Sequence, residues 1–125
     1  MNEQEAFWSG KEGKDYHSQQ GWPEWGMNSL ESRAYMFDRA LYDTETFYGP
    51  LWSALEFGCG EGQNLIALRR VFPDIELSGV EINEQAASVT PDDCDVHVDS
   101  ILTWASEERF DLTFTRGVLI HIHPN

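Results

Sequence analysis

The stretch Glu56-Phe-Gly-Cys-Gly-Glu-Gly62 decides the fold class of this chain. The short apolar run before it, residues 53–57, predicts a buried strand. The run after it, residues 63–72, has apolar side chains at helical spacing and predicts a helix. Glycines in such a turn permit positive φ and let a ligand approach the backbone closely. The stretch therefore predicts a strand, a ligand-binding turn and a helix in direct succession.

Strands and helices continue to alternate after this unit. Further strands are expected at residues 75–82, 96–98 and 111–115, with a short helix at 84–89 and a helical or irregular stretch at 101–108. Alternating strands and helices imply βαβ units, a parallel sheet and right-handed crossovers. The fold class is therefore α/β.

The first 50 residues are expected to form a cap of helices and loops. A short helix is predicted at residues 3–9, a loop punctuated by Gly and Pro at 10–26, and a longer helix at 29–44. Asn28 and Glu31 fit a capping arrangement at the start of that longer helix. Its apolar stripe is interpreted as a packing surface and comprises Leu30, Ala34, Phe37 and Leu41.

Carboxylates follow two of the expected strands. Glu81 lies at the end of the second strand, about 20 residues beyond the glycines, where a Rossmann-type fold places the acid that binds ribose hydroxyls. Ile82 beside it is positioned to pack on an adenine face, and Asp99 follows the third strand. Either carboxylate alone is compatible with a solvated strand end. Their order after a glycine turn favours a site for a nucleoside-containing cofactor.

The spacing of the glycines separates two kinds of cofactor turn. The dinucleotide pattern G-x-G-x-x-G requires a third glycine at position 63, which is Gln63 here. The pattern E-x-G-x-G-x-G at residues 56–62 instead resembles motif I of class I S-adenosylmethionine-dependent methyltransferases. A nucleotide-binding Rossmann protein remains a weaker alternative.

This resemblance implies a Rossmann-like sheet with strand order 3-2-1-4 over residues 51–125, behind the cap of residues 1–50. The family's sheet has further strands, so the chain looks like an incomplete S-adenosylmethionine-binding half-domain. In the family an acidic residue at the place of Asp99 lies near the adenine amino group. The residues expected to bind the cofactor are Glu56, Gly58, Cys59, Gly60, Gly62, Asn64, Glu81, Ile82, Asp99, Ser100, Ile101 and Arg116.

Three segments resemble a narrower family, the pseudaminic acid biosynthesis-associated methylases. The more specific ones are Glu5-Ala-Phe-Trp-Ser-Gly10 and Arg116-Gly-Val-Leu-Ile-His-Ile-His-Pro124, and Gly79-Val-Glu-Ile-Asn83 is the third. Leu55-Glu-Phe-Gly58 and Asn64-Leu-Ile-Ala-Leu68, around the glycine turn, also belong to this resemblance. The resemblance implies methyl transfer to a small molecule, a sugar or nonulosonic-acid-type precursor of surface polysaccharide. The segment at residues 17–26 departs from the family and leaves the acceptor open.

Residues after the fourth strand are candidates for chemistry. Methyl transfer from a sulfonium is an in-line displacement, so a general base is needed only if the acceptor loses a proton. His121 is the candidate for an acid/base or substrate-orienting role, and a structural role is the alternative. Arg116 is suited to a bidentate contact with a carboxylate. His121 and His123 alternate without a third ligand in view, so no metal is expected.

The amino-acid composition argues against some classes of binding partner. The chain has 125 residues, with 22 acidic residues against eight Lys and Arg and a formal charge of -14. Such a charge argues against nucleic acid and anionic membranes. Cys59 and Cys94 are interpreted as reduced and structural. The absence of a signal peptide pattern or long apolar run leads us to expect a cytoplasmic protein.

Two further hypotheses concern the missing strands. An exposed edge at the fourth strand would invite a partner chain or self-association. A truncated, catalytically silent S-adenosylmethionine-binding or interaction module is the alternative to an enzyme.

Overall fold

The computed structural model describes residues 1–20 and 26–119, with side chains at 1–15 and 26–119. Four parallel strands form one sheet in the order β3-β2-β1-β4, which confirms the predicted α/β class and strand order. The strands are β1 (Ser53–Phe57), β2 (Glu76–Glu81), β3 (Cys94–Val98) and β4 (Leu112–Thr115). The helices are α1 (Glu3–Ser9), α2 (Lys11–Gln20), α3 (Leu30–Ala40), α4 (Thr44–Tyr48), α5 (Gln63–Val71) and α6 (Glu84–Ser88).

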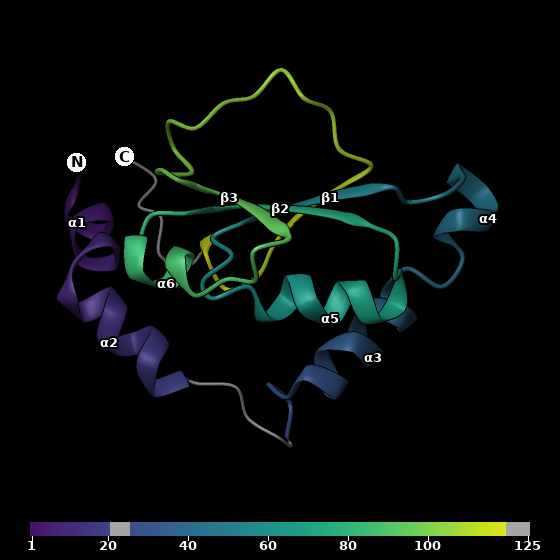
Figure 1. Cartoon of the computed structure of the whole chain (residues 1–125), viewed down its shortest axis with the longest axis horizontal. Helices are drawn as coiled ribbons and strands as arrows, with labels where there is room; N and C mark the ends of the chain where they lie inside the picture. Colours follow the sequence, from purple (N-terminus) through teal and green to yellow (C-terminus); the bar gives the residue numbers. More distant parts are fainter. Residues whose placement is uncertain (21–25, 120–125) are drawn as a thin grey trace.

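The two faces of the sheet are covered differently. The helices α3, α5 and α6 lie on one side, together with α1 and α2, and the segment that joins β3 to β4 arches over the other (Figure 1). On that second face the Trp104 ring contacts the rings of Phe57 and His97. Because all four strands are parallel, their carboxyl ends meet at one edge, where the turns after β1, β2 and β3 come together.

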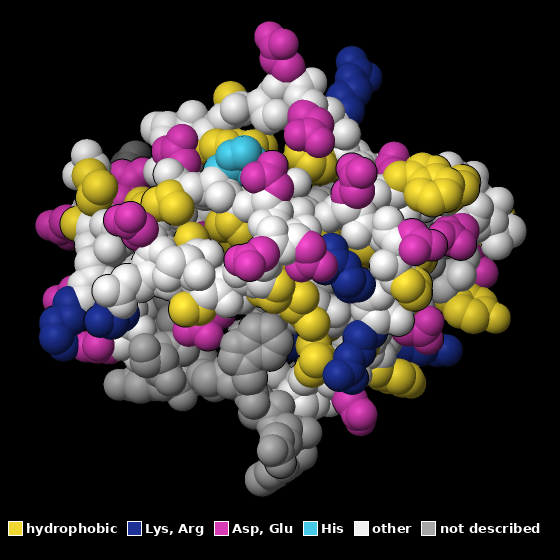
Figure 2. Space-filling model, viewed as in Figure 1, with side chains coloured by type: hydrophobic (Ala, Val, Ile, Leu, Met, Phe, Trp, Pro, Cys, Tyr) yellow, Lys and Arg dark blue, Asp and Glu magenta, His cyan; other side chains and the backbone are white. Residues whose placement is uncertain are grey.

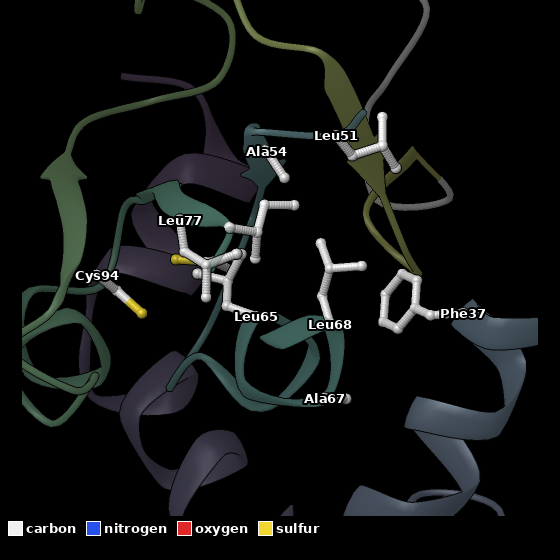
Figure 3. Close-up of a cluster of buried hydrophobic side chains, with 10 residues drawn as sticks. Phe37, Leu51, Ala54, Leu65, Ala67, Leu68, Leu77 and Cys94 are labelled. Carbon is white, nitrogen blue, oxygen red and sulfur yellow. The ribbon is translucent and has the colours of Figure 1, made fainter. Parts of the chain in front are cut away.

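The hydrophobic core lies between the sheet and α5. Leu65 and Leu68 of α5 are fully buried, and they point toward Ala54 and Leu77 of the sheet (Figure 3). Phe37 of α3 faces Leu68 and stacks edge-on against Phe114 of β4. The predicted packing role of the apolar stripe on α3 is therefore confirmed, since Leu30, Ala34 and Leu41 also pack against this core.

The predicted loop at residues 10–26 is wrong over its first part, which forms α2. Gly13 is one of the glycines expected to interrupt a helix in this segment, but it lies inside α2, close to the Trp8 backbone at the end of α1. A Cβ atom at this position would lie 2.1 Å from the Trp8 carbonyl oxygen, so only glycine lets the two helices approach so closely. The short helix predicted at residues 3–9 is confirmed.

The predicted helix at residues 29–44 is shorter and is followed by a second helix. It begins at Leu30, with Ser29 rather than Asn28 as its N-cap, because the extended Ser29 accepts a hydrogen bond from the Ser32 amide. It ends at Ala40, and α4 follows until Gly49, whose φ of 89° ends that helix.

The stretch at residues 101–108 is irregular rather than helical. The Asp99 side chain accepts hydrogen bonds from the Ser100 amide and the Thr103 hydroxyl, while the Ser100 hydroxyl accepts one from the Leu102 amide. Such local side-chain bonds offer the backbone an alternative to helical hydrogen bonds. Within residues 1–20 and 26–119, no helix has the length and apolar character to cross a membrane.

Candidate functional site

A pocket of about 300 Å³ opens at the carboxyl end of β1. Its wall combines the glycine turn with residues from α3, from the start of α5 and from the segment after β4. The lining residues are Asn28, Arg33, Glu56, Gly58, Cys59, Gly60, Glu61, Gln63, Asn64, Arg116 and Gly117. Acidic and basic side chains thus share one pocket, and its volume is at the lower end of the range for small-molecule sites.

The glycine turn is tied to the neighbouring strand β2. The amides of Gly58 and Cys59 donate to the Val80 carbonyl oxygen at 2.7 and 3.2 Å, and the Gly60 amide donates to Glu81 Oε1 at 2.8 Å. Gly58 and Gly60 have φ of 74° and 57°, in the left-handed region that favours glycine. These N–H groups are therefore bonded within the protein and not directed at a ligand. The absence of side chains at the glycines would still let a ligand come close to the backbone of the turn.

Glu56 of β1 lines the pocket and is only 1% exposed. Its Oε2 accepts a hydrogen bond from Asn64 Nδ2 at 2.8 Å, and Asn64 Oδ1 accepts one from Arg33 Nη1 at 2.6 Å. Its Oε1 is buried without a hydrogen-bond partner in the part of the chain that the structure describes. Burial raises the pKa of Glu56 to about 8, although Asn64 and Arg33 act in the opposite direction.

Glu81 of β2 is a second buried carboxylate and is 5% exposed. Besides the Gly60 amide, it accepts the Asn83 amide on Oε2 at 2.7 Å. Both oxygens are thereby bound to the backbone of turns at the edge of the sheet. Each oxygen retains a second lone pair, so the carboxylate can accept further hydrogen bonds.

The amino-terminal helix α1 is attached to this same edge. The Asn83 side chain donates to the carbonyl oxygens of Trp8 and Gly10 at 2.9 and 3.1 Å. The Ser100 hydroxyl, just after β3, donates to Glu5 Oε1. Helix α1 therefore bridges the turns that follow β2 and β3.

The structure divides the predicted site residues into two groups. Those in the pocket are Glu56, Gly58, Cys59, Gly60, Asn64 and Arg116. The others lie outside its lining, at the N-cap of α5 or at the ends of β2 and β3, and comprise Gly62, Glu81, Ile82, Asp99, Ser100 and Ile101. The candidate acid/base His121 lies outside the described residues.

Sequence reasoning missed Arg33, Asn28, Asn83 and Glu5, which come from segments remote from the glycine motif. A signal existed for Arg33, because a charged residue one turn before Phe37 falls beside the apolar stripe of α3. Cys59 lines the pocket, but burial raises the pKa of its thiol, with the Glu56 carboxyl adding to this effect, so it is poorly suited to be a nucleophile. Among the described residues, no three His, Cys, Asp or Glu side chains converge as a metal site.

A family model described as a methyltransferase domain matches residues 14–125 of the chain. The chain belongs to this methyltransferase domain family. The match includes the glycine turn and the strands β1 to β4, and so covers the whole pocket described above. A comparison with curated protein sequences gives no match.

Solved methyltransferase structures share the fold. The plantazolicin methyltransferase BpumL, in complex with a monoazolic desmethylPZN analog and SAH, superposes with a TM-score of 0.62 at 19% identity, covering 87% of this chain and 43% of that chain. The sugar N-methyltransferase KedS8 from Streptoalloteichus sp ATCC 53650 gives 0.60 at 18% identity, with coverages of 86% and 40%. SAM-bound CalS10, an amino pentose methyltransferase from Micromonospora echinaspora, gives 0.59 at 16%, with coverages of 83% and 41%. The chain spans less than half the length of these structures.

Proposed function

We propose that this chain is the cofactor-binding part of an S-adenosylmethionine-dependent methyltransferase that acts on a small molecule. The observation that carries the proposal is the pocket beside the glycine turn, which holds Glu56 together with Arg33 and Arg116. An α-amino acid group carries one positive and one negative charge, and this pocket offers a partner for each. S-adenosylmethionine would supply the electrophilic methyl group, bound to a sulfonium.

The residues of the pocket fit the methionine end of that cofactor. Glu56 has a buried oxygen without a partner among the described residues, and such a group calls for a donor. Arg116 is exposed at the rim and is free to turn toward a carboxylate. Asn64 fixes the Glu56 carboxyl and the Arg33 guanidinium relative to each other.

The ends of β2 and β3 are proposed to hold the adenosyl group. Glu81 keeps lone pairs that can accept ribose hydroxyls, while Gly60 and Asn83 hold its carboxylate in place. The partly buried Ile82 is adjacent, and Asp99 is exposed after β3. Ser100 and Ile101 belong to the same turn, which α1 holds through Glu5. Gly62 completes the predicted cofactor set as the left-handed N-cap of α5.

Electrostatics favours this cofactor over a dinucleotide. A pyrophosphate would need free N–H groups in the turn, but the amides of Gly58, Cys59 and Gly60 are bonded to β2. Glu56 and Glu61 also line the pocket, and neither side chain supplies a positive charge to a phosphate. Acidic side chains are spread widely over the visible surface (Figure 2), consistent with the formal charge of -14.

The acceptor is proposed to be a sugar or sugar acid. Two of the matched folds belong to enzymes that methylate sugars, and the sequence resembles the pseudaminic acid-associated methylases. As an alternative to the cofactor carboxylate, Arg116 of the pocket lining suits a contact with a sugar carboxylate. The acid/base role proposed for His121 rests on sequence alone.

Calorimetric titration with S-adenosylmethionine, S-adenosylhomocysteine and NAD tests the cofactor assignment. We expect the two sulfur ligands to bind at micromolar concentration and NAD not to bind. Glu81→Ala should weaken binding by about 1–3 kcal/mol because charged hydrogen bonds to ribose are lost. Glu76→Ala is the matched control, since Glu76 is exposed on the same strand.

The acceptor is tested separately with the radiolabelled methyl donor and amino sugars or sugar acids. Labelled product that disappears on Glu56→Gln substitution supports a working enzyme. Cofactor binding without transfer to any sugar would remove the acceptor proposal and leave a binding module. A folded chain that binds neither sulfur ligand would overturn the function itself.

A further inference from the structure

Glu56 is held in surroundings that do not support a full negative charge. The side chain is 1% exposed and receives one neutral hydrogen bond, from the Asn64 amide, on Oε2. Oε1 has no donor within the described ranges. An ionised carboxylate would accept several hydrogen bonds, so burial with a single donor favours the protonated form. Its pKa of about 8 agrees with this geometry.

Three charged residues near Glu56 influence its pKa. Arg33 of α3 and Arg116 after β4 are positive, but Asn64 stands between Arg33 and the carboxyl, and Arg116 is exposed to solvent. The negative charge of Glu81 on β2 raises the pKa of Glu56 further. Burial outweighs the two arginines in the free protein.

Two more titratable groups share the pocket wall. Glu61 of the glycine turn is one of them. The Cys59 thiol has a pKa raised by burial, so it stays neutral beside Glu56. Arg33 and Arg116 line the same pocket, but none of the ion pairs among the described residues involves the Glu56 carboxyl.

We propose that Glu56 carries a proton in the free protein and releases it when the cationic amino group of the cofactor enters the pocket. The inference rests on the proposed function and adds to it a coupling between cofactor binding and proton release. A positive charge beside the carboxyl stabilises its ionised form, so ligand and proton compete for the same group. Because Glu56 is ionised only beside a positive charge, the pocket should favour ligands with a protonated amino group over otherwise similar nucleosides.

The coupling has a defined dependence on pH. With a free-state pKa of about 8, roughly nine in ten Glu56 side chains are protonated at pH 7. Binding should therefore release about 0.9 proton per ligand at pH 7 and about 0.5 at pH 8. The affinity for the cofactor should rise by up to about tenfold per pH unit between pH 6 and 7.5, because the fraction of Glu56 side chains that must lose a proton falls as pH rises.

Isothermal titration of the intact chain in buffers of different ionisation enthalpy counts these protons. S-adenosylhomocysteine carries the amino group, whereas 5′-methylthioadenosine lacks the whole amino acid moiety. We expect the first ligand to bind with release of about 0.9 proton at pH 7 and the second to bind with none. The second ligand controls for titration of groups elsewhere in the chain.

Glu56→Gln sharpens the assignment, provided that circular dichroism shows the variant folded. It should bind S-adenosylhomocysteine more weakly and without proton release, while 5′-methylthioadenosine binds as before. S-adenosylhomocysteine binding to the unmodified protein without proton release would overturn the coupling and leave the cofactor assignment standing. If neither ligand binds the folded chain, the cofactor assignment and the coupling both fail.

Discussion

Two buried glutamates lie near the carboxyl ends of adjacent strands, and they differ in the hydrogen bonds that their oxygens accept. Glu81 accepts a backbone N–H on each oxygen, from Gly60 and Asn83, so it is part of the structure of two turns. Glu56 accepts one side-chain donor, from Asn64, and its other oxygen has no partner among the described residues. Two carboxyl groups of similar burial therefore differ in how far the protein itself satisfies them. Glu81 fixes two turns at this edge of the sheet, and Glu56 is the carboxyl that we propose to meet a charged ligand.

Removing the structural carboxylate should have the largest effect. Glu81→Ala leaves the amides of Gly60 and Asn83 without their acceptor, and each unsatisfied buried donor costs about 1–3 kcal/mol. We expect the free energy of unfolding to fall by about 2–5 kcal/mol in urea denaturation. Glu76→Ala on the same strand should change it by less than about 0.5 kcal/mol. Equal midpoints for the two variants would refute the structural role of Glu81.

The effect of replacing Glu56 on the free energy of unfolding should depend on pH. Its folded pKa of about 8 lies above the unfolded value, so the native state binds the proton more tightly. The stabilisation is present at low pH and is lost as pH rises toward 8. The unmodified protein should therefore lose roughly 2 kcal/mol of stability relative to Glu56→Gln between pH 6 and 8, and little more above that. A stability difference that stays constant with pH would contradict the buried, protonated carboxyl.

A smaller effect is expected at the residue that joins Glu56 to α3. Asn64→Leu removes the donor to Glu56 and the acceptor of Arg33, and should lower the free energy of unfolding by about 1–2 kcal/mol. Arg70→Lys, exposed on the same helix, should leave it nearly unchanged. Thermal unfolding of both variants, each compared with the unmodified chain, measures the difference. Equal stabilities would show that this hydrogen-bonded link contributes nothing.

The smallest expected effect concerns the helix that bridges the turns after β2 and β3. Glu5→Ala removes the acceptor of the Ser100 hydroxyl, so amide hydrogens at residues 100–104 should exchange faster. The substitution also removes the Glu5 contact with the Asn2 amide in the capping box of α1. Glu3→Ala, in the first turn of the same helix, is the control and should leave exchange at 100–104 unchanged. Matching exchange rates in both variants would exclude a role for Glu5 at this turn.

Sequence reasoning performed best where short-range patterns decide the structure. The strand and helix around the glycine turn were predicted because an apolar run, a glycine cluster and a helical stripe follow one another. It failed at α2, because Gly13 was interpreted by its helix propensity and not by the close packing against Trp8 that requires it.

The sequence predicts those parts of the candidate site that follow from local patterns, but not the contacts between segments that are distant in the sequence. Glu56, Glu81 and the glycines follow from their places at strand ends. The network that reaches Arg33 depends on how α3 packs against α5, a tertiary contact that residue spacing does not encode. The contrast between the two glutamates likewise depends on which amides the folded turns direct at them.

Two-dimensional NMR of the ¹⁵N-labelled chain, with and without saturating S-adenosylhomocysteine, would locate the proposed cofactor site directly. We expect the backbone amides at residues 58–62, 81–83 and 99–101 to shift, because these segments surround both glutamates and include the turn after β3. The amides of α4, at the opposite end of the sheet from α1 (Figure 1), should stay unchanged. Binding that leaves residues 58–62 and 81–83 unshifted would contradict the placement of the cofactor at this edge.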